Sequence, residues 1–358
     1  MTVLLTITIL ILTGIAVWQI TKIFELSQIG LKKDDSQIAT EKDNDLNGKL
    51  MFAFLVFIYL VTIYCFWAYT KVLLPESASE HGAIYDTLLW VSFAIILFAQ
   101  TITQAVLHYF AYKYRGINNR KAYFFTHDNK LELIWTVIPA IIFFVLIIYG
   151  MITWGQIMNF GEEDEDDLVV ELYAQQWNWK ARYGGLDNVL GDANVRFLND
   201  FDGKNAVGID SSDPNGMDDF VVTQEFHLPV NRKVIFKMRS QDVLHSAYMP
   251  HFRAQMNCVP GMITEFSFTP TVTTEEMRQN SDVVAKVNRI NKIRYDKSQK
   301  LISKGEEGLD SYQFDYLLLC AKVCGTSHYN MQMKIIVESE KDYKKWAVQQ
   351  QTFSEIIQ

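Results

Sequence analysis

Four long apolar runs occupy the first part of this chain and limit its fold more than any other feature. They cover residues 3 to 20, 51 to 74, 88 to 111 and 133 to 157, and each is near the roughly twenty residues that a membrane-spanning helix needs. From Gly161 onward charged residues recur, and the apolar residues come in short alternating runs typical of β-strands. The sequence therefore predicts a helical membrane anchor followed by an extramembrane domain rich in β-structure.

The loops between these runs predict how the anchor is oriented. The connection 112 to 132 carries five basic residues, whereas the connection 75 to 87 contains no Lys or Arg. Because cytoplasmic loops are enriched in Lys and Arg, the first of these connections is expected inside and the second outside. Both termini and the β-rich domain then lie outside. Residues 1 to 24 lack a basic start and a small-x-small cleavage site, so we expect a retained span there.

A cluster of soft metal ligands follows an apolar run in the last part of the chain. Cys320, Cys324, His328 and Met331 fall within twelve residues. Thiolate and thioether ligands favour copper, iron–sulfur clusters or zinc over hard cations, and a methionine placed after a histidine is more typical of copper than of zinc. The alternatives are a reduced thiol pair in a core and a zinc site, but Met331 and the lack of a second cysteine pair fit neither. Two cysteines four residues apart can bridge two copper ions.

A further histidine stands in the segment Asp242-Val-Leu-His245-Ser, which is followed by Val259-Pro-Gly261. Together with the pattern Cys-x-x-x-Cys-Gly-x-x-His-x-x-Met, these motifs resemble subunit II of haem-copper cytochrome c oxidase. The resemblance runs from about residue 85 to 340, with two insertions. It implies a cupredoxin fold, a Greek-key β-sandwich or barrel, that carries a binuclear copper A centre.

The same resemblance implies the ligands of that centre. Cys320 and Cys324 would bridge the two copper ions. His245 and Met331 would complete one ion. His328 and the backbone carbonyl of Lys322 would complete the other.

Two positions depart from the family pattern. Most relatives have a glutamate where this chain has Lys322, and many have an aspartate where it has Asn257. In the family these acids lie at a magnesium ion at the interface with the catalytic subunit. A backbone carbonyl survives a change of side chain, so the copper site is not threatened. Magnesium is doubtful, however, and our hypothesis is that the Lys322 ammonium takes the place of the missing cation.

Two more residues match family positions with known roles. Gln176-Trp177-Asn178-Trp179 resembles the aromatic segment through which electrons enter, and Trp177 corresponds to the residue that receives them. A core position is the alternative for an aromatic residue on a strand, and alternation puts Trp177 and Trp179 on the same face. Glu132, three residues before Trp135, matches the acid at the entrance of a proton path into the catalytic subunit. Its alternative role is a solvated helix-start residue.

In the extramembrane half we expect strands near 168 to 174, 176 to 183, 220 to 227, 232 to 238, 263 to 268, 315 to 320 and 333 to 338. The segment 187 to 219 predicts a long exposed loop, and the charged segment 275 to 308 predicts an inserted helix or helical pair. The expected domains are two N-terminal transmembrane helices with a cytoplasmic loop (1 to 75), a transmembrane hairpin (76 to 158), the copper A domain (159 to 340) and a C-terminal helical tail (341 to 358).

Charge and cysteine usage bear on the partners. The formal net charge is −8, and an acidic run covers residues 162 to 167. This run is either a solvated linker or, with Asp242, a surface that attracts a basic cytochrome c. The chain has no Cys-x-x-Cys-His motif, so the donor haem is expected on a separate protein. Cys258 is expected to be buried near the metal site, and no disulfide framework is implied.

The function that the resemblance implies is that of a cytochrome c oxidase subunit in a bacterial inner membrane, with its copper domain on the periplasmic side. It would take electrons from cytochrome c and pass them to the haem-copper catalytic subunit, which reduces oxygen to water and pumps protons. Membrane lipid and other oxidase subunits are the remaining partners, and no nucleic acid is expected. Two alternatives remain. A subunit of a quinol oxidase would have the same fold but usually lacks the copper ligands, which this chain retains. A membrane-anchored copper carrier could use the same ligands but would need neither Trp177 nor Glu132.

Overall fold

The computed structural model of this chain describes residues 2–30, 40–117, 120–121, 123–159 and 166–358. Most of the acidic run 162–167 therefore lies outside the described residues. The chain divides into two compact units, Met1–Thr70 with Phe93–Trp135, and Lys71–Ser92 with Thr136–Gln358. We describe each unit by itself.

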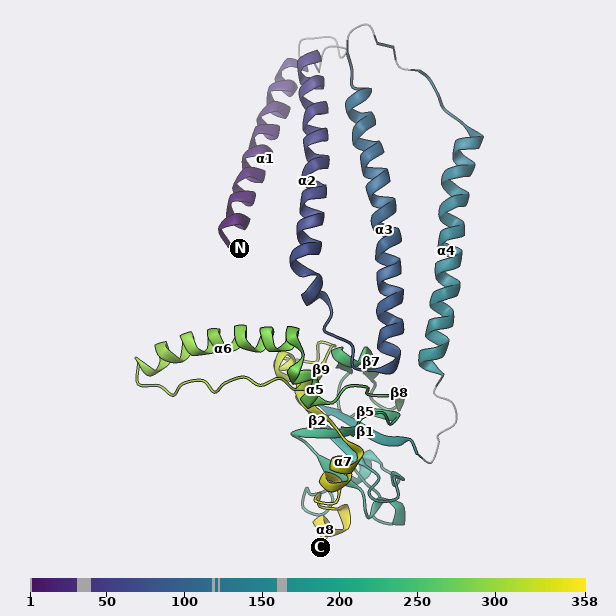
Figure 1. Cartoon of the computed structure of the whole chain (residues 1–358), viewed down its shortest axis with the longest axis vertical. Helices are drawn as coiled ribbons and strands as arrows, with labels where there is room; N and C mark the ends of the chain where they lie inside the picture. Colours follow the sequence, from purple (N-terminus) through teal and green to yellow (C-terminus); the bar gives the residue numbers. More distant parts are fainter. Residues whose placement is uncertain (1, 31–39, 118–119, 122, 160–165) are drawn as a thin grey trace. The chain divides into compact units, whose positions relative to one another are not determined.

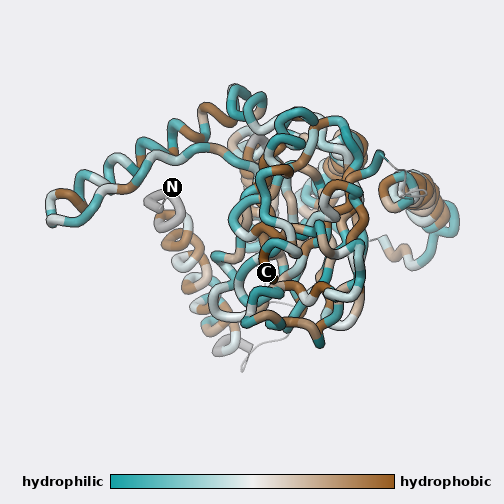
Figure 2. The backbone as a smooth tube through the Cα atoms, turned by 90° about the horizontal axis from the view of Figure 1, so that it is seen from below, coloured by the Kyte–Doolittle hydropathy of each residue, from teal (hydrophilic) through white to brown (hydrophobic). Residues whose placement is uncertain are grey.

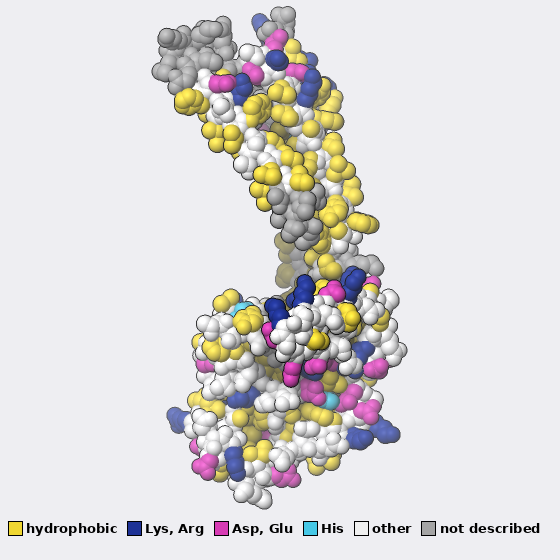
Figure 3. Space-filling view, turned by 90° about the vertical axis from the view of Figure 1, so that its left-hand side faces the viewer, with side chains coloured by type: hydrophobic (Ala, Val, Ile, Leu, Met, Phe, Trp, Pro, Cys, Tyr) yellow, Lys and Arg dark blue, Asp and Glu magenta, His cyan; other side chains and the backbone are white. Residues whose placement is uncertain are grey.

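Four long helices precede the β-rich part of the chain (Figure 1): α1 (Thr2–Gly30), α2 (Glu41–Leu73), α3 (Glu80–Lys113) and α4 (Asn129–Met158). Each has the length and the apolar composition of a membrane span. Their surfaces present mainly hydrophobic side chains (Figure 3). The prediction of four spans is thus confirmed at the level of helices. Each helix begins before its predicted apolar run, and all but α2 also end after it, because further residues continue the helical backbone at the ends.

Polar contacts connect α2 and α3 in the first unit. The Arg115 guanidinium pairs with Asp45 at 2.8 Å (Nη2 to Oδ1) and lies over the ring of Tyr112. The Tyr59 hydroxyl donates a hydrogen bond to the Thr101 carbonyl. The Tyr59 bond satisfies a hydroxyl that hydrocarbon would leave unpaired, and the Arg115–Asp45 pair joins the helix ends outside the apolar runs, so both favour the pairing of the two helices.

The second unit contains a β-sandwich of two five-stranded sheets. The first sheet has the order β3-β2-β1-β5-β8 and the second has the order β4-β10-β9-β6-β7. The strands of the first are β1 (Leu168–Gln175), β2 (Asn178–Tyr183), β3 (Phe220–Val222), β5 (Val234–Ser240) and β8 (Thr264–Phe268). Those of the second are β4 (Glu225–Pro229), β6 (His245–Met249), β7 (Ala254–Cys258), β9 (Tyr316–Cys320) and β10 (Gln332–Glu338). β1 pairs parallel with β5 and β4 pairs parallel with β10, while the other pairs are antiparallel.

The main core lies between the two sheets and is filled by aliphatic and aromatic side chains from both. Leu172 of β1 and Phe236 of β5 meet Phe226 of β4 and Leu318 of β9 in this core. Alternation along β1 sends Tyr173 to the opposite face, where it joins a smaller cluster with Val207 and Ile209. β1 is therefore buried on both faces, which explains its nearly continuous apolar sequence.

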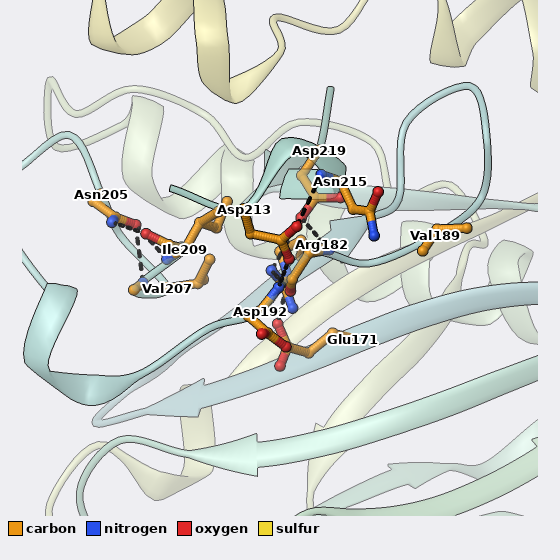
Figure 4. Close-up of polar contacts among 12 residues, drawn as sticks. Glu171, Arg182, Val189, Asp192, Asn205, Val207, Ile209, Asp213, Asn215 and Asp219 are labelled. Atoms are coloured by element: carbon orange, nitrogen blue, oxygen red, sulfur yellow. Dashed lines mark hydrogen bonds and ion pairs between the residues drawn. The ribbon is translucent and has the colours of Figure 1, made fainter. Parts of the chain in front are cut away.

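The segment 187–219 covers that second face of β1, so the prediction of an exposed loop is wrong in part. Asn205 is buried and its Oδ1 accepts hydrogen bonds from the amides of Gly208 (3.0 Å) and Ile209 (2.9 Å). Beneath the segment, Arg182 pairs with Glu171 at 2.6 Å and with Asp219 at 3.0 Å (Figure 4). The buried charges of Arg182 and Glu171 are tolerated because the two are paired. Some of the Asp and Asn residues of this segment therefore form internal hydrogen bonds and ion pairs and do not simply face solvent.

The structure corrects three strand predictions. The expected strand 220 to 227 is two strands, β3 and β4, because the chain crosses from one sheet to the other at residues 223–224. β6 and β7 were not expected. β2 begins at Asn178, so Trp177 lies in the turn before it, and the two tryptophans do not share a face: Trp177 is 38% exposed and Trp179 is buried.

Helices fill the predicted insertion and the C-terminal tail. α5 (Thr274–Gln279) and α6 (Ser281–Ile302) lie between β8 and β9, and α7 (Glu340–Ala347) and α8 (Phe353–Ile357) follow β10. α6 extends from the sandwich as an arm, and the segment 303–313 returns beside it (Figure 2). Hydrogen bonds join the two, including Asn291 Nδ2 to the Tyr312 carbonyl at 3.0 Å and the Leu309 amide to Ser298 Oγ at 2.8 Å.

Candidate metal centre

Strand pairing in the second sheet brings the two halves of the metal motif together. His245 is the first residue of β6, and β6 pairs with β9 so that Ala247 lies opposite Cys320. Cys320 ends β9, and the loop 321–331 leads into β10. The Cys320 amide donates to the Met331 carbonyl at 3.1 Å, which closes this loop at its base. Backbone ladders therefore hold both ends of the site.

All six predicted ligand groups lie in one cluster. The sulfur atoms of Cys320 and Cys324 are 3.8 Å apart. His245 Nδ1 is 3.8 Å from the Cys320 sulfur, and the Lys322 carbonyl oxygen is 3.2 Å from it. His328 Nδ1 and Met331 Sδ lie 3.7 Å and 3.9 Å from the Cys324 sulfur. Each cysteine thus has its own pair of neighbouring ligand groups.

This arrangement fits a soft metal. Metal–thiolate bonds are about 2.3 Å long, so two sulfurs 3.8 Å apart leave room for an ion on either side of the line that joins them. Burial, and then the neighbouring Cys320, raise the pKa of the Cys324 thiol to about 11. Without a cation this thiol is neutral at pH 7, whereas a bound metal ion favours the thiolate. Two sulfurs, two imidazoles and a thioether are the donors that copper prefers.

Asp242 fixes the ring of His245. Its Oδ1 lies 2.8 Å from His245 Nε2, and its Oδ2 accepts from the Gln176 amide at 2.8 Å. Burial alone would raise the pKa of Asp242, but these two contacts stabilise the carboxylate and leave the pKa below its usual value. With Nε2 engaged, Nδ1 faces the thiol of Cys320. Such outer carboxylate contacts orient metal-binding histidines.

Trp177 lies against the ligand loop. A Cβ built on Gly325 would be 3.0 Å from both Cζ2 and Nε1 of the Trp177 ring. Gln176 Nε2 donates to the Cys324 carbonyl at 2.6 Å. The sequence does not identify Gln176 and Gly325 as parts of the site, although each is adjacent to a predicted site residue. The ring of Trp177 is therefore partly exposed to solvent on one side and lies close to the ligand loop on the other.

The remaining predicted residues lie around or away from this cluster. Cys258 is fully buried on β7 directly opposite His245, as expected. Asn257 and Lys322 have exposed side chains. Glu132 is in the first turn of α4, with its Oε1 3.9 Å from His127 Nδ1, and it belongs to the other compact unit.

Fold and site together define a membrane-anchored β-sandwich protein with a cluster of two cysteines, two histidines and a methionine that is consistent with a copper site. The transmembrane-domain model of cytochrome c oxidase subunit II matches residues 71–152, and the model of its periplasmic domain matches residues 168–289. An alternative cytochrome c oxidase subunit 2 of Bradyrhizobium diazoefficiens is 31% identical over 289 residues, which is 80% of this chain and 86% of the relative. The cytochrome c oxidase subunit 2 of Cereibacter sphaeroides is 24% identical over 71% of this chain and 72% of the relative. The chain belongs to the cytochrome c oxidase subunit II family.

It is accordingly a subunit of the haem-copper oxidase complex and a multi-pass membrane protein with a periplasmic domain. The periplasmic domain of subunit II of cytochrome oxidase of Bradyrhizobium japonicum is similar with a TM-score of 0.30 and 16% identity, over 52% of this chain and 94% of that one. At this score the likeness adds nothing to the sandwich assignment, which follows from the strand pairing. The family match ends at residue 289, so the ligand loop 321–331 lies beyond it.

Proposed function

We propose that this subunit accepts electrons from a cytochrome c at a binuclear copper A centre and passes them to the haem-copper catalytic subunit, which reduces oxygen to water and pumps protons. The observation that carries the proposal is the pair of cysteine sulfurs 3.8 Å apart, with four further ligand groups around the pair. Two bridged copper ions supply a one-electron carrier that shares the electron between them. The proposed site is the bacterial inner membrane, with the copper domain facing the periplasm.

The residues of the chain have distinct tasks in this proposal. Cys320 and Cys324 would hold both ions, and the strand ladder behind them would limit their movement during electron transfer. His245, kept in position by Asp242, and Met331 would bind one ion. Burial of Cys324 and Met331 excludes water from the sulfur ligands. A site that changes little between oxidation states transfers electrons with little reorganisation.

The test is the electron paramagnetic resonance spectrum of the full chain, purified in detergent and loaded with copper. Hyperfine structure from two equivalent coppers that share one electron is expected. Cys324→Ser should abolish it, because one bridging sulfur is lost. Cys258→Ser is the matched control. Cys258 is buried on β7 opposite His245, but it is not a proposed ligand. A single-copper spectrum from the unaltered chain would reject the binuclear centre in favour of a carrier or a variant site.

We propose Trp177 as the residue at which electrons enter. The support is its 38% exposure together with its contact to the ligand loop at Gly325. Trp177→Leu should slow electron uptake from reduced cytochrome c in stopped-flow measurements and leave the copper spectrum unchanged. Unchanged uptake would place the electron path elsewhere.

Three further assignments are proposals that rest on family position. Glu132 is proposed at the entrance of the proton path, so Glu132→Gln should reduce proton pumping by the assembled oxidase. Lys322 and Asn257 are proposed to leave the magnesium site unfilled, and metal analysis that finds one magnesium per complex bound through this subunit would contradict this. The division into a span pair (1–75), a span hairpin (76–158), a copper domain (159–340) and a tail (341–358) is the proposed domain arrangement.

A further inference from the structure

The inserted helix α6 is basic although the chain as a whole is acidic. α6 has 22 residues and is therefore about 33 Å long. Its sequence contains six Lys or Arg residues and two Asp residues, against a formal charge of −8 for the chain. Figure 3 faces this side of the molecule, where Lys and Arg side chains lie together with Asp and Glu side chains. The copper centre uses no residue of this helix.

Five of the basic side chains point into solvent without a carboxylate partner. They are exposed, and no ion pair involves them in the part of the chain that the structure describes. The sixth, Arg294, donates instead to the Asp310 carbonyl at 2.6 Å. The five exposed residues, named here the basic face, are Lys286, Arg289, Lys292, Lys297 and Lys300. Their charge is available to an outside partner.

Exposed apolar side chains lie beside the basic face. Val284, Tyr295 and Ile302 are 41%, 63% and 55% exposed. Their spacings of eleven and seven residues are close to whole turns, so the three share one side of the helix. Val283 and Val287, by contrast, contact the sandwich core. The exposed apolar side is thus not needed to attach α6 to the domain.

The N-terminus of α6 is attached next to the start of a membrane span. Asn280, the N-cap of α6, donates from Nδ2 to the carboxylate of Glu76. Glu76 is four residues before Glu80, where α3 begins. The same linker is held by backbone bonds from the Ala78 amide to His251 (2.7 Å) and from the Thr271 amide to Ala78 (2.8 Å). α6 therefore begins beside the short linker that leads into α3.

We propose that α6 docks on the membrane surface and that its basic face binds the headgroups of anionic phospholipids. A helix with Lys and Arg on one side and exposed apolar side chains on another is typical of helices that lie in the membrane interface. Each basic side chain near an anionic surface strengthens such a contact about fivefold. An acidic protein could also bind the basic face, but such a contact would not require the exposed apolar side chains of Val284, Tyr295 and Ile302. Attachment at the start of α3 favours the lipid.

Lysine footprinting of the full chain in lipid nanodiscs tests the proposal. The nanodiscs contain either phosphatidylcholine alone or phosphatidylcholine with phosphatidylglycerol, and acetylation of individual lysines is measured by mass spectrometry. Lys286, Lys292, Lys297 and Lys300 should react at least about threefold more slowly with the anionic lipid, and high salt should reverse this protection. Lys341 and Lys345, exposed on α7, are the internal controls and should react equally in both.

Two variants keep the four reporter lysines in place. Arg289→Gln combined with Tyr295→Ser should reduce the protection, whereas Lys345→Gln should not change it. Equal acetylation in both lipids would overturn the proposal. Protection that requires the other oxidase subunits and is independent of phosphatidylglycerol would also overturn it, in favour of an acidic protein partner. Neither result affects the copper proposal, which the spectrum of the same preparation tests separately.

Discussion

Replacing Gly325 by alanine should disturb electron entry without removing a ligand. Gly325 has φ +129°, a conformation that costs other residues about 1–3 kcal/mol. The added Cβ would also lie 3.0 Å from Trp177 Cζ2 and Nε1 and from Gln176 Nε2, so these groups must shift by a few tenths of an ångström. Gln176 is held by its bond to the Cys324 carbonyl, whereas the Trp177 ring is partly exposed and can move. We therefore expect a stability loss of about 1–3 kcal/mol and slower electron uptake through Trp177.

Gly261→Ala is the matched control. Gly261 also has a positive φ, +83°, but nothing lies within 4 Å of a Cβ built there. It should lose a similar amount of stability and keep its rate of electron uptake. Stability is measured by the denaturant concentration at which the copper absorption is lost, and uptake by stopped-flow mixing with reduced cytochrome c. If Gly325→Ala and Gly261→Ala change the uptake rate equally, the contact between Gly325 and Trp177 has no part in electron entry.

Three other predictions concern the scaffold. Burial raises the pKa of Asp219 from 3.8 to about 7, although Arg182 opposes this rise. Between about pH 4 and pH 7 the folded protein therefore keeps a proton on Asp219 that the unfolded chain releases. Stability should then fall as the pH rises from about 4 to about 7, and Asp219→Asn should flatten this dependence in thermal unfolding curves. Arg253→Met breaks the bidentate pair with Asp86 (2.7 and 2.8 Å) and should cost about 3 kcal/mol in denaturant unfolding. Asn205→Ala removes three buried hydrogen bonds and should speed hydrogen exchange at residues 205–209 by loosening that turn.

The sequence predicts the helices of this chain better than its strands, for a physical reason. Each span shows its own apolar run of about twenty residues, and no partner is needed to recognise it. A strand is stabilised by its neighbours in the sheet, so a continuous pattern such as 220 to 227 conceals a crossing between sheets. β6 is short and contains a histidine and a serine, so its pairing with β7 and β9 cannot be inferred from local composition. The cover of β1 by residues 187–219 also depends on tertiary contacts alone.

The candidate site was more predictable than the sandwich around it. Ligand residues carry chemistry that few other residues share, so their type and spacing are informative wherever the strands run. The structure places all six ligand groups together. The groups that orient them are harder to predict. Gln176 contributes its backbone amide and its side-chain amide, and Gly325 leaves room for the Trp177 ring because it has no side chain. The sequence suggests Asp242 as part of an acidic docking surface, whereas in the structure its carboxylate contacts and orients the ring of His245.

The two departures from the family pattern fall where the fold uses only the backbone. At position 322 the carbonyl lies 3.2 Å from the Cys320 sulfur while the lysine side chain is exposed. At position 257 the backbone pairs with Ser246, and the carbonyl accepts from the Thr264 hydroxyl at 2.5 Å. Neither side chain makes a contact that positions a proposed copper ligand, so we expect the proposed metal centre and the fold to tolerate both. We therefore expect the two departures to affect only the binding of a hard cation, because a carboxylate binds such an ion and an ammonium group does not.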